Sequence, residues 1–101
     1  MPTDVSALAE LDRLIHEPAR LALTAILSVV ESADFLYLQR ETGLTKGNLS
    51  SHLAKLEEAG YVAIEKTYRG RIPLTLVRLT ATGAAAYKAY RARFRKFLEK
   101  T

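Results

Sequence analysis

A stripe of leucines between two glycines, within residues 42–61, constrains the fold of this chain more than any other feature. Its members are Leu49, Leu53 and Leu56. Their spacing is that of one helix face, so the stripe should point inward. Gly43 can end a preceding short helix because glycine tolerates positive φ, and Thr45 can cap the next helix. Because a strand-like run begins after Gly60, we predict a helix over about 45–59.

The other side of this predicted helix carries short polar and basic side chains. The residues on or beside this side are Lys46, Gly47, Asn48, Ser51 and Lys55, and Gly47 adds no side chain at all. Short side chains let the helix backbone approach a partner, and polar ones can meet base edges, so this face fits a DNA major groove. Asn48 can pair bidentately with adenine or make a local hydrogen bond near the helix start. Lys46 suits guanine acceptors or a phosphate.

The remaining residues of this face leave more than one interpretation open. Gly47 costs about 1 kcal/mol of helix stability relative to alanine, which a close approach to a neighbouring helix or to DNA would offset. Ser50 and Ser51 offer hydroxyls to phosphates or bases, although serine is also common in the first turns of helices. Lys55 suits a phosphate contact or a solvated surface.

Charge is unevenly distributed along the 101 residues, although the net charge is only +4. Residues 1–45 carry three basic and seven acidic side chains, whereas residues 46–101 carry twelve basic and four acidic ones. The basic half therefore begins at the predicted helix. Such a region suits a polyanionic partner, although charge alone is equally typical of a solvated surface.

Three helices are predicted before this one. The first covers about 4–16, and the second begins at Pro18, where the missing N–H of proline is tolerated, and runs to about Val30. The broad apolar face of the second helix marks it as the central core helix. A very short strand near 33–35 and a helix over 36–42 follow. A tight glycine-containing turn then joins two helices, as in a helix-turn-helix unit.

After the leucine helix the pattern changes to period two, which predicts a β-hairpin over 61–79 with its turn centred on Gly70. Arg69 and Arg71 flank this glycine at the hairpin tip. They can enter a narrow minor groove, clamp phosphates or simply aid solubility. Pro73 is tolerated at the start of the return strand.

The last predicted helix covers about 81–99, with Thr80 as its cap, and gathers half of the eight aromatic side chains on one side. They are Tyr87, Tyr90, Phe94 and Phe97, and Leu98 adjoins them. Left in water, this stripe would form a sizeable apolar patch, so it belongs either to the core of the chain itself or to a dimer interface. Because no repeat, linker or low-complexity tract is found, we expect one mainly α domain with a small hairpin (α+β) over residues 1–101.

Several classes of site are disfavoured. The absence of cysteine excludes disulfides and thiolate metal sites. His16 and His52 lie on different predicted elements, so a packed or hydrogen-bonded His52 is favoured over a metal ligand. No nucleophile–base pair or phosphate-binding glycine loop indicates an enzyme, and no cofactor is predicted. No apolar run reaches the roughly 18–20 residues of a membrane span and no secretion signal is seen, so we predict a cytoplasmic protein.

Three motifs fall in order along the chain. They are EPARLALTAIL (Glu17–Leu27), ETGLTKGNLSSHLAKLEEAGYV (Glu41–Val62) and RLTATG (Arg78–Gly83). The middle motif is highly specific, whereas the outer two are weak alone but lie at the right distances. With these motifs the whole chain resembles a single-domain winged-helix transcriptional regulator of the ArsR/MarR-like kind, with N-terminal and long C-terminal dimerisation helices.

This resemblance implies a homodimer that binds a partly palindromic operator in double-stranded DNA, with the recognition helix in the major groove and the hairpin, or wing, on the neighbouring backbone or minor groove. The implied contacts are Lys46, Gly47, Asn48, Ser50, Ser51 and Lys55 on the helix, and Arg69 and Arg71 on the wing. Similar wings often carry more basic residues than this one, which leaves its contribution to affinity open. The alternative is a winged-helix protein-interaction module that does not bind DNA.

The resemblance also suggests how the aromatic stripe is covered. The minimal winged-helix core ends before the last helix, so little of the chain itself should cover the stripe. We therefore expect a two-fold interface with the 4–16 helix packed beside it. The expected interface residues are Leu8, Leu11, Ile15, Tyr87, Tyr90, Phe94, Phe97 and Leu98. A small apolar effector near Tyr87 and Tyr90 could act by changing the separation of the two recognition helices.

Overall fold

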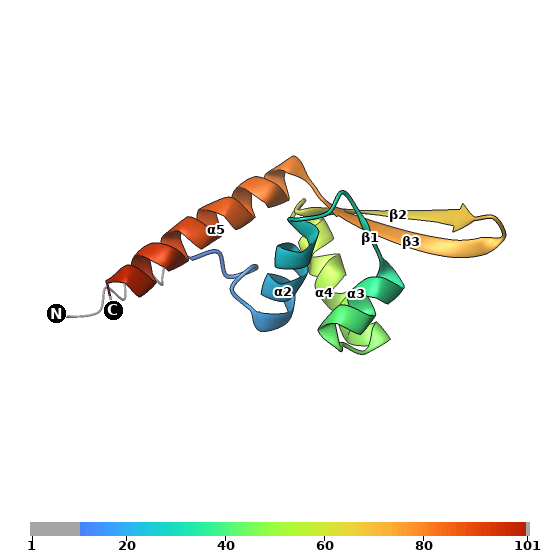
Figure 1. Cartoon of the computed structure of the whole chain (residues 1–101), viewed down its shortest axis with the longest axis horizontal. Coiled ribbons are helices and arrows are strands. Elements are labelled where there is room, and N and C mark those ends of the chain that lie inside the picture. Colours follow the sequence, from blue (N-terminus) through green and yellow to red (C-terminus); the bar gives the residue numbers. More distant parts are fainter. Residues whose placement is uncertain (1–10, 101) are drawn as a thin grey trace.

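The computed structural model describes residues 11–100, which form four helices and a three-stranded sheet. The elements are α2 (Pro18–Leu27), β1 (Ala33–Asp34), α3 (Phe35–Thr42), α4 (Lys46–Glu58), β2 (Val62–Arg69), β3 (Ile72–Leu79) and α5 (Ala81–Glu99). Helix α5 and the β2–β3 hairpin extend in opposite directions from the group of α2, α3 and α4 (Figure 1). The molecule is therefore elongated, with extents of 60 × 26 × 21 Å.

Each helix begins at a side chain that accepts hydrogen bonds from the free backbone N–H groups of the first turn. The capping residues are Glu17 for α2, Asp34 for α3, Thr45 for α4 and Thr80 for α5. Gly43 ends α3 with a φ of 70°, a left-handed conformation that favours glycine. These local signals confirm the predicted starts of α4 and α5 at Thr45 and Thr80.

The sheet is antiparallel, with strand order β1-β3-β2. Arg69 pairs with Ile72, so Gly70 and Arg71 form a two-residue turn. Only Gly70 has positive φ there, at 64°, which is the requirement of a type II′ hairpin turn. The predicted hairpin and its glycine-centred turn are thus confirmed.

The main core joins α2, α3, α4 and the sheet around the leucine stripe of α4. Its buried members are Leu23, Leu27, Ala33, Leu38, Leu49, Leu53, Leu56, Val62 and Val77. The three leucines of α4 are at most 2% exposed. Because α4 buries this stripe, the rest of its circumference is turned away from the core.

A second core cluster lies beneath α5. It consists of Leu11, Ile15 and Tyr90, with half-buried neighbours including Tyr61, Tyr87 and Phe94. The Tyr90 hydroxyl is 2.7 Å from His16 Nδ1, and the Tyr90 and Phe94 rings stack with centroids 5.9 Å apart. The expectation that little of the chain itself covers the aromatic stripe is therefore wrong for Tyr90, which packs against the segment before α2.

The end of α4 is joined tightly to the start of α5. Thr80 donates its backbone N–H to the Tyr61 carbonyl at 2.9 Å and its hydroxyl to the Gly60 carbonyl at 2.6 Å. Gly83 packs so closely that a Cβ placed there would lie 2.1 Å from the Tyr61 carbonyl oxygen. The glycine of the RLTATG motif therefore permits a contact between two backbones.

Two predicted boundaries are wrong. In the predicted 4–16 helix, residues 11–16 form bends and turns because the Asp12 Oδ1 accepts hydrogen bonds from the Leu14 and Ile15 N–H groups; residues 4–10 lie outside the described residues. Helix α2 ends at Leu27 rather than near Val30. Val29 follows the helix and is 81% exposed. This valine is therefore not part of the core, although its apolar side chain fitted the pattern of a longer helix.

Candidate nucleic-acid interface

The side chains expected to contact DNA project from α4 away from the core. The residues concerned, all of them exposed, are Lys46, Gly47, Asn48, Ser50, Ser51 and Lys55. Thr45 caps the helix by accepting the Asn48 backbone N–H at 3.1 Å, whereas the Asn48 side chain has no hydrogen bond to residues 11–100. The cap is thus supplied by Thr45, and the Asn48 amide points to solvent with both donor and acceptor available.

Gly47 has open space around it. A Cβ built on this residue meets no heavy atom within 4 Å outside its local backbone. Close packing against a neighbouring helix, one of the two explanations considered for this glycine, is therefore excluded within the described chain. The other explanation, a close approach of the helix backbone to DNA at this glycine, stays a prediction.

A polar bridge fixes α4 against the start of α2. Arg20 donates its Nε–H to the Leu14 carbonyl at 2.6 Å, and its NH1 group lies 3.0 Å from His52 Nδ1. Glu17 Oε2 lies 3.6 Å from the same histidine nitrogen and 3.8 Å from Arg20. His52 is accordingly hydrogen-bonded at the domain surface, as predicted, and links the recognition helix to α2.

The Glu17 carboxylate in this bridge is held in its ionised form. Burial alone would raise its pKa, but hydrogen bonds from the Arg20 and Ala19 N–H groups, with His52 and Arg20 nearby, lower the pKa below its ordinary value. The same carboxylate therefore caps α2 and faces two basic side chains. This combination explains why a glutamate precedes Pro18 at the entry to the helix.

The wing carries its cations both at its tip and along its length. Arg71 lies in the turn and Arg69 opposite Ile72, and both are exposed. Tyr68 and Ile72 are large apolar side chains that remain 70% and 67% exposed near the tip. Lys66 is a further exposed cation of β2, and its place in the sequence alone does not mark it as a candidate contact.

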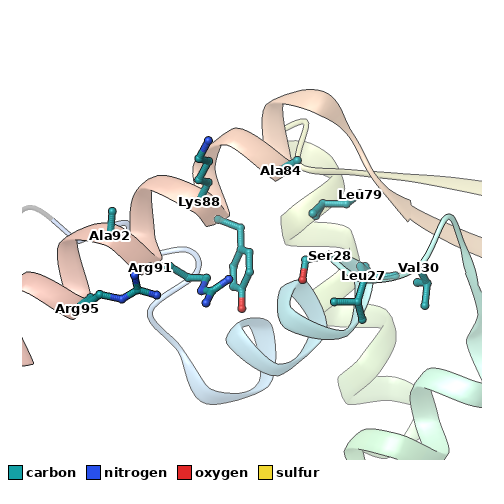
Figure 2. Close-up of a pocket in the computed structure, with 11 residues that line it drawn as sticks. Leu27, Ser28, Val30, Leu79, Ala84, Lys88, Arg91, Ala92 and Arg95 are labelled. Carbon is teal, nitrogen blue, oxygen red and sulfur yellow. The ribbon is translucent and has the colours of Figure 1, made fainter.

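A separate groove of about 590 Å³ lies between the end of α2 and the middle of α5. Leu27, Val29, Leu79 and Ala84 contribute apolar surface, and Tyr87 lines it from α5. Three cations also line it: Lys88, Arg91 and Arg95. Figure 2 shows Arg91 and Arg95 extending along this side of α5, with Ser28 opposite. The Arg91 guanidinium lies 5.9 Å from the centre of the Tyr87 ring.

The residues expected at a dimer interface divide into two groups. Leu11, Ile15 and Tyr90 are at most 4% exposed within one chain, so they leave little surface for a partner. Tyr87, Phe94 and Phe97 are half-buried, and Leu98 is 55% exposed. Leu8 lies outside the described residues.

Two further kinds of site are absent from residues 11–100. No group of three or more histidine and carboxylate side chains there is placed to hold a metal ion. None of the helices in the same range combines the length and apolarity that a membrane crossing requires.

A helix-turn-helix followed by a β-hairpin, with an uncovered polar face on the second helix, defines the winged-helix class. The family model described as "Winged helix DNA-binding domain" matches residues 19–98. The chain belongs to this family.

Two relatives extend this finding. The chain is 37% identical over 79 residues to an uncharacterized protein, MJ0432, of Methanocaldococcus jannaschii, a match that covers 77% of this chain and 85% of the relative. It is 36% identical over 78 residues to the uncharacterized HTH-type transcriptional regulator YcgE of Bacillus subtilis. That match covers 68% of this chain and 51% of YcgE, so the chain spans about half of that relative.

Solved structures share the fold. A transcriptional regulator homologue from Pyrococcus horikoshii is 29% identical, with a TM-score of 0.87 over 93% of this chain and 95% of its own. A MarR-family regulator from Enterococcus faecalis is 22% identical, with a TM-score of 0.75 over 99% and 93%. An ArsR-family structure shares the fold as well. The predicted likeness to ArsR/MarR-type regulators, which are not enzymes, is confirmed for the fold.

Proposed function

We propose that this protein is a sequence-specific transcriptional regulator that binds double-stranded DNA as a homodimer on a partly palindromic operator. The observation that carries the proposal is the outer face of α4. Gly47, Asn48, Ser51 and Lys55 are exposed there, and no part of residues 11–100 covers them. Asn48 is suited to a bidentate contact with adenine, and the open space at Gly47 lets the helix backbone approach the groove floor.

Selection of bound sequences from random DNA, followed by titrations at several salt concentrations, tests this proposal. We expect an enriched, partly palindromic site and a log affinity that falls with log salt by about 0.9 for each phosphate contact. Asn48→Ala should reduce the preference for the selected site over unrelated DNA. No binding to any DNA at low salt would favour the alternative, a protein-interaction module; the polar and basic face of α4 speaks against that alternative.

A homodimer is supported by the apolar surface that α5 leaves uncovered. Phe94 and Phe97 are only half-buried and Leu98 is largely exposed within one chain. Pairing of two α5 helices about a two-fold axis would cover this surface. It would also present two recognition helices, which a palindromic operator requires about 34–36 Å apart.

An effector, if one regulates this dimer, has a suitable place in the groove between α2 and α5 (Figure 2). Arg91 and Arg95 line this groove, whereas Tyr90 is buried elsewhere. An effector there would therefore be an anion with an apolar part rather than the purely apolar ligand first expected. Melting-temperature shifts with aromatic carboxylates, absent with the corresponding neutral amides and lost in Arg91→Ala, would support this site.

A further inference from the structure

Between α4 and the wing lies a second groove, of about 300 Å³, which shares Lys46 and Ser50 with the expected interface but extends beyond it to the strands of the wing. Lys46 and Ser50 line it from α4, and Lys66 and Thr75 line it from the two strands of the wing. Leu53 and Ile64 are among the apolar residues that line it as well. The groove thus presents two cations and two hydroxyls on facing walls, with apolar side chains between them.

The strand register explains why Lys66 belongs to this groove. Lys66 pairs with Thr75, two positions along from the pair of Ile64 and Val77. Side chains two apart on a strand share a face, and Val77 is fully buried against the core. Lys66 therefore lies on the face of the sheet that packs against the core. At Lys66 this face has passed the edge of the core and lies nearer the tip of the wing.

The periodicity of α4 separates its exposed residues into two rows. Lys46 and Ser50 are four residues apart and line the groove beside the wing. Asn48, Ser51 and Lys55, at spacings of three and four, form a second row that is absent from the groove lining. The two rows point in different directions from the helix. A ligand that contacts both rows must therefore contact each row with a different part.

The charges of the groove favour an anionic occupant. Lys46 and Lys66 are exposed, and neither has an ion pair with residues 11–100. The single carboxylate among the lining residues is that of Glu57, about 16 Å along the helix axis from Lys46 at 1.5 Å per residue. The groove therefore has no carboxylate near the start of α4, where its polar groups are cationic or hydroxyl groups.

We propose that this groove holds one sugar–phosphate strand of the DNA, clamped by Lys46 from α4 and Lys66 from the wing. The proposal rests on the DNA-binding function proposed above. If α4 lies in the major groove and the wing tip reaches the adjacent minor groove, the strand that separates the two grooves must pass between α4 and the wing. Ser50 and Thr75 can donate hydroxyl hydrogen bonds to its phosphates, and the apolar floor contacts its sugars.

This placement of the strand divides the exposed residues of α4, which form a single group in the sequence, between phosphate contacts and base contacts. Lys46 contacts a phosphate rather than guanine, and Lys66 joins it as a second phosphate contact. Asn48 and Ser51, in the other row, remain to meet the base edges. Affinity that is independent of sequence then arises mainly between helix and wing, while discrimination arises on the outer row of α4.

The test compares Lys66→Ala with Arg78→Ala, which removes the same charge from the other face of the sheet, where Arg78 pairs with Ala63. Each variant is titrated with the selected operator and with unrelated DNA over a range of salt concentrations. We expect Lys66→Ala to weaken both DNAs by the same factor and to reduce the salt slope by about 0.9 for each bound subunit. Lys66→Arg should restore the slope, and Arg78→Ala should leave it unchanged.

The possible failures are distinguishable. If the unaltered protein binds no DNA, the proposed function itself fails. If the unaltered protein binds DNA and Lys66→Ala has the same dependence of log affinity on log salt as Arg78→Ala, Lys66 does not contact a phosphate. The proposed clamp is then wrong, and the DNA-binding function stands. A loss confined to the operator would also overturn the clamp, because a phosphate contact carries no sequence preference. Thermal melting of each variant confirms that these exposed substitutions leave the fold intact.

Discussion

Gly83 and Gly47 are both glycines in the first turn of a helix, yet their surroundings differ completely. A Cβ at Gly83 would collide with the Tyr61 backbone, whereas a Cβ at Gly47 would meet nothing within 4 Å. We expect Gly83→Ala to lower the free energy of unfolding by about 3 kcal/mol, because backbone atoms cannot move aside cheaply. Urea unfolding measures this change, and a variant as stable as the unaltered protein would contradict the close contact.

Gly47→Ala should have the opposite effect on stability. Alanine favours the helix, so the free energy of unfolding should rise by up to about 1 kcal/mol, while DNA affinity falls because the added methyl group holds the backbone away from the groove. Unfolding and DNA titrations on the same preparation separate the two effects. Unchanged DNA affinity would show that the helix backbone does not approach DNA at this residue.

Tyr61 makes the free energy of unfolding depend on pH in the alkaline range. Its hydroxyl donates to the Asp12 carboxylate at 2.5 Å, and this bond, with burial and the carboxylate charge, raises the pKa of Tyr61 from 10.0 to about 12. A pKa raised by folding contributes stability that is complete below the unfolded pKa and is lost as the pH rises through the folded one. The contribution should therefore be full below pH 10 and disappear towards pH 12.

Tyr61→Phe provides the measurement. The stability difference between the unaltered protein and this variant, obtained by urea unfolding, should stay constant from neutral pH to about 10 and shrink by about pH 12. Unfolding of Tyr61→Phe should correspondingly depend less on pH in that range. A difference that remains constant up to the highest pH would mean that the bond to Asp12 does not perturb the tyrosine.

At the scale of single elements, Arg20 determines how α4 meets α2. Its side chain is 12% exposed and bonds both the Leu14 carbonyl and His52. We expect Arg20→Met to lower the free energy of unfolding by about 1.5–3 kcal/mol, the range for hydrogen bonds of charged groups, and to weaken DNA binding through the position of α4. Arg40→Met, at an exposed position on α3, is the matched control and should change neither quantity.

Element boundaries were predictable where the deciding interaction is local. Thr45, Gly43 and Thr80 act within one turn of the helix they cap, so the sequence alone places these ends correctly. The predicted 4–16 helix is wrong over residues 11–16 because Asp12 bonds nearby N–H groups and turns the chain instead. Apolar spacing does not reveal this competition, because the deciding side chain is polar.

The candidate site was predictable in part for the same reason. The exposed row on α4 follows from the leucine stripe, since burying three leucines fixes which side chains face outward. Lys66 could not be found in this way, because its place beside Lys46 depends on the strand register and on how the sheet packs against α4. The burial of Tyr90 was missed because it depends on a segment more than 70 residues away, which includes His16.

At the scale of the whole molecule, the proposed homodimer predicts that a charge on the apolar stripe of α5 prevents dimerisation. Leu98 is 55% exposed, so Leu98→Asp should leave the fold of one chain intact while preventing pairing of the apolar stripes. Sedimentation should then report monomers, and affinity for a palindromic site should fall towards that for a half-site. Ala89→Asp adds the same charge on the other side of α5 and should remain dimeric. Identical sedimentation of both variants would rule out this interface.

The junction of α4 and α5 has a mechanical consequence. The two hydrogen bonds of Thr80 and the contact of Gly83 with the Tyr61 carbonyl leave no slack between the end of one helix and the beginning of the next. Because this junction is so closely packed, we expect a rotation of α5 to move α4 with it rather than to bend the chain between the two helices. In the proposed dimer, a ligand that changes the angle between the two α5 helices would therefore reorient both α4 helices together, without a separate hinge.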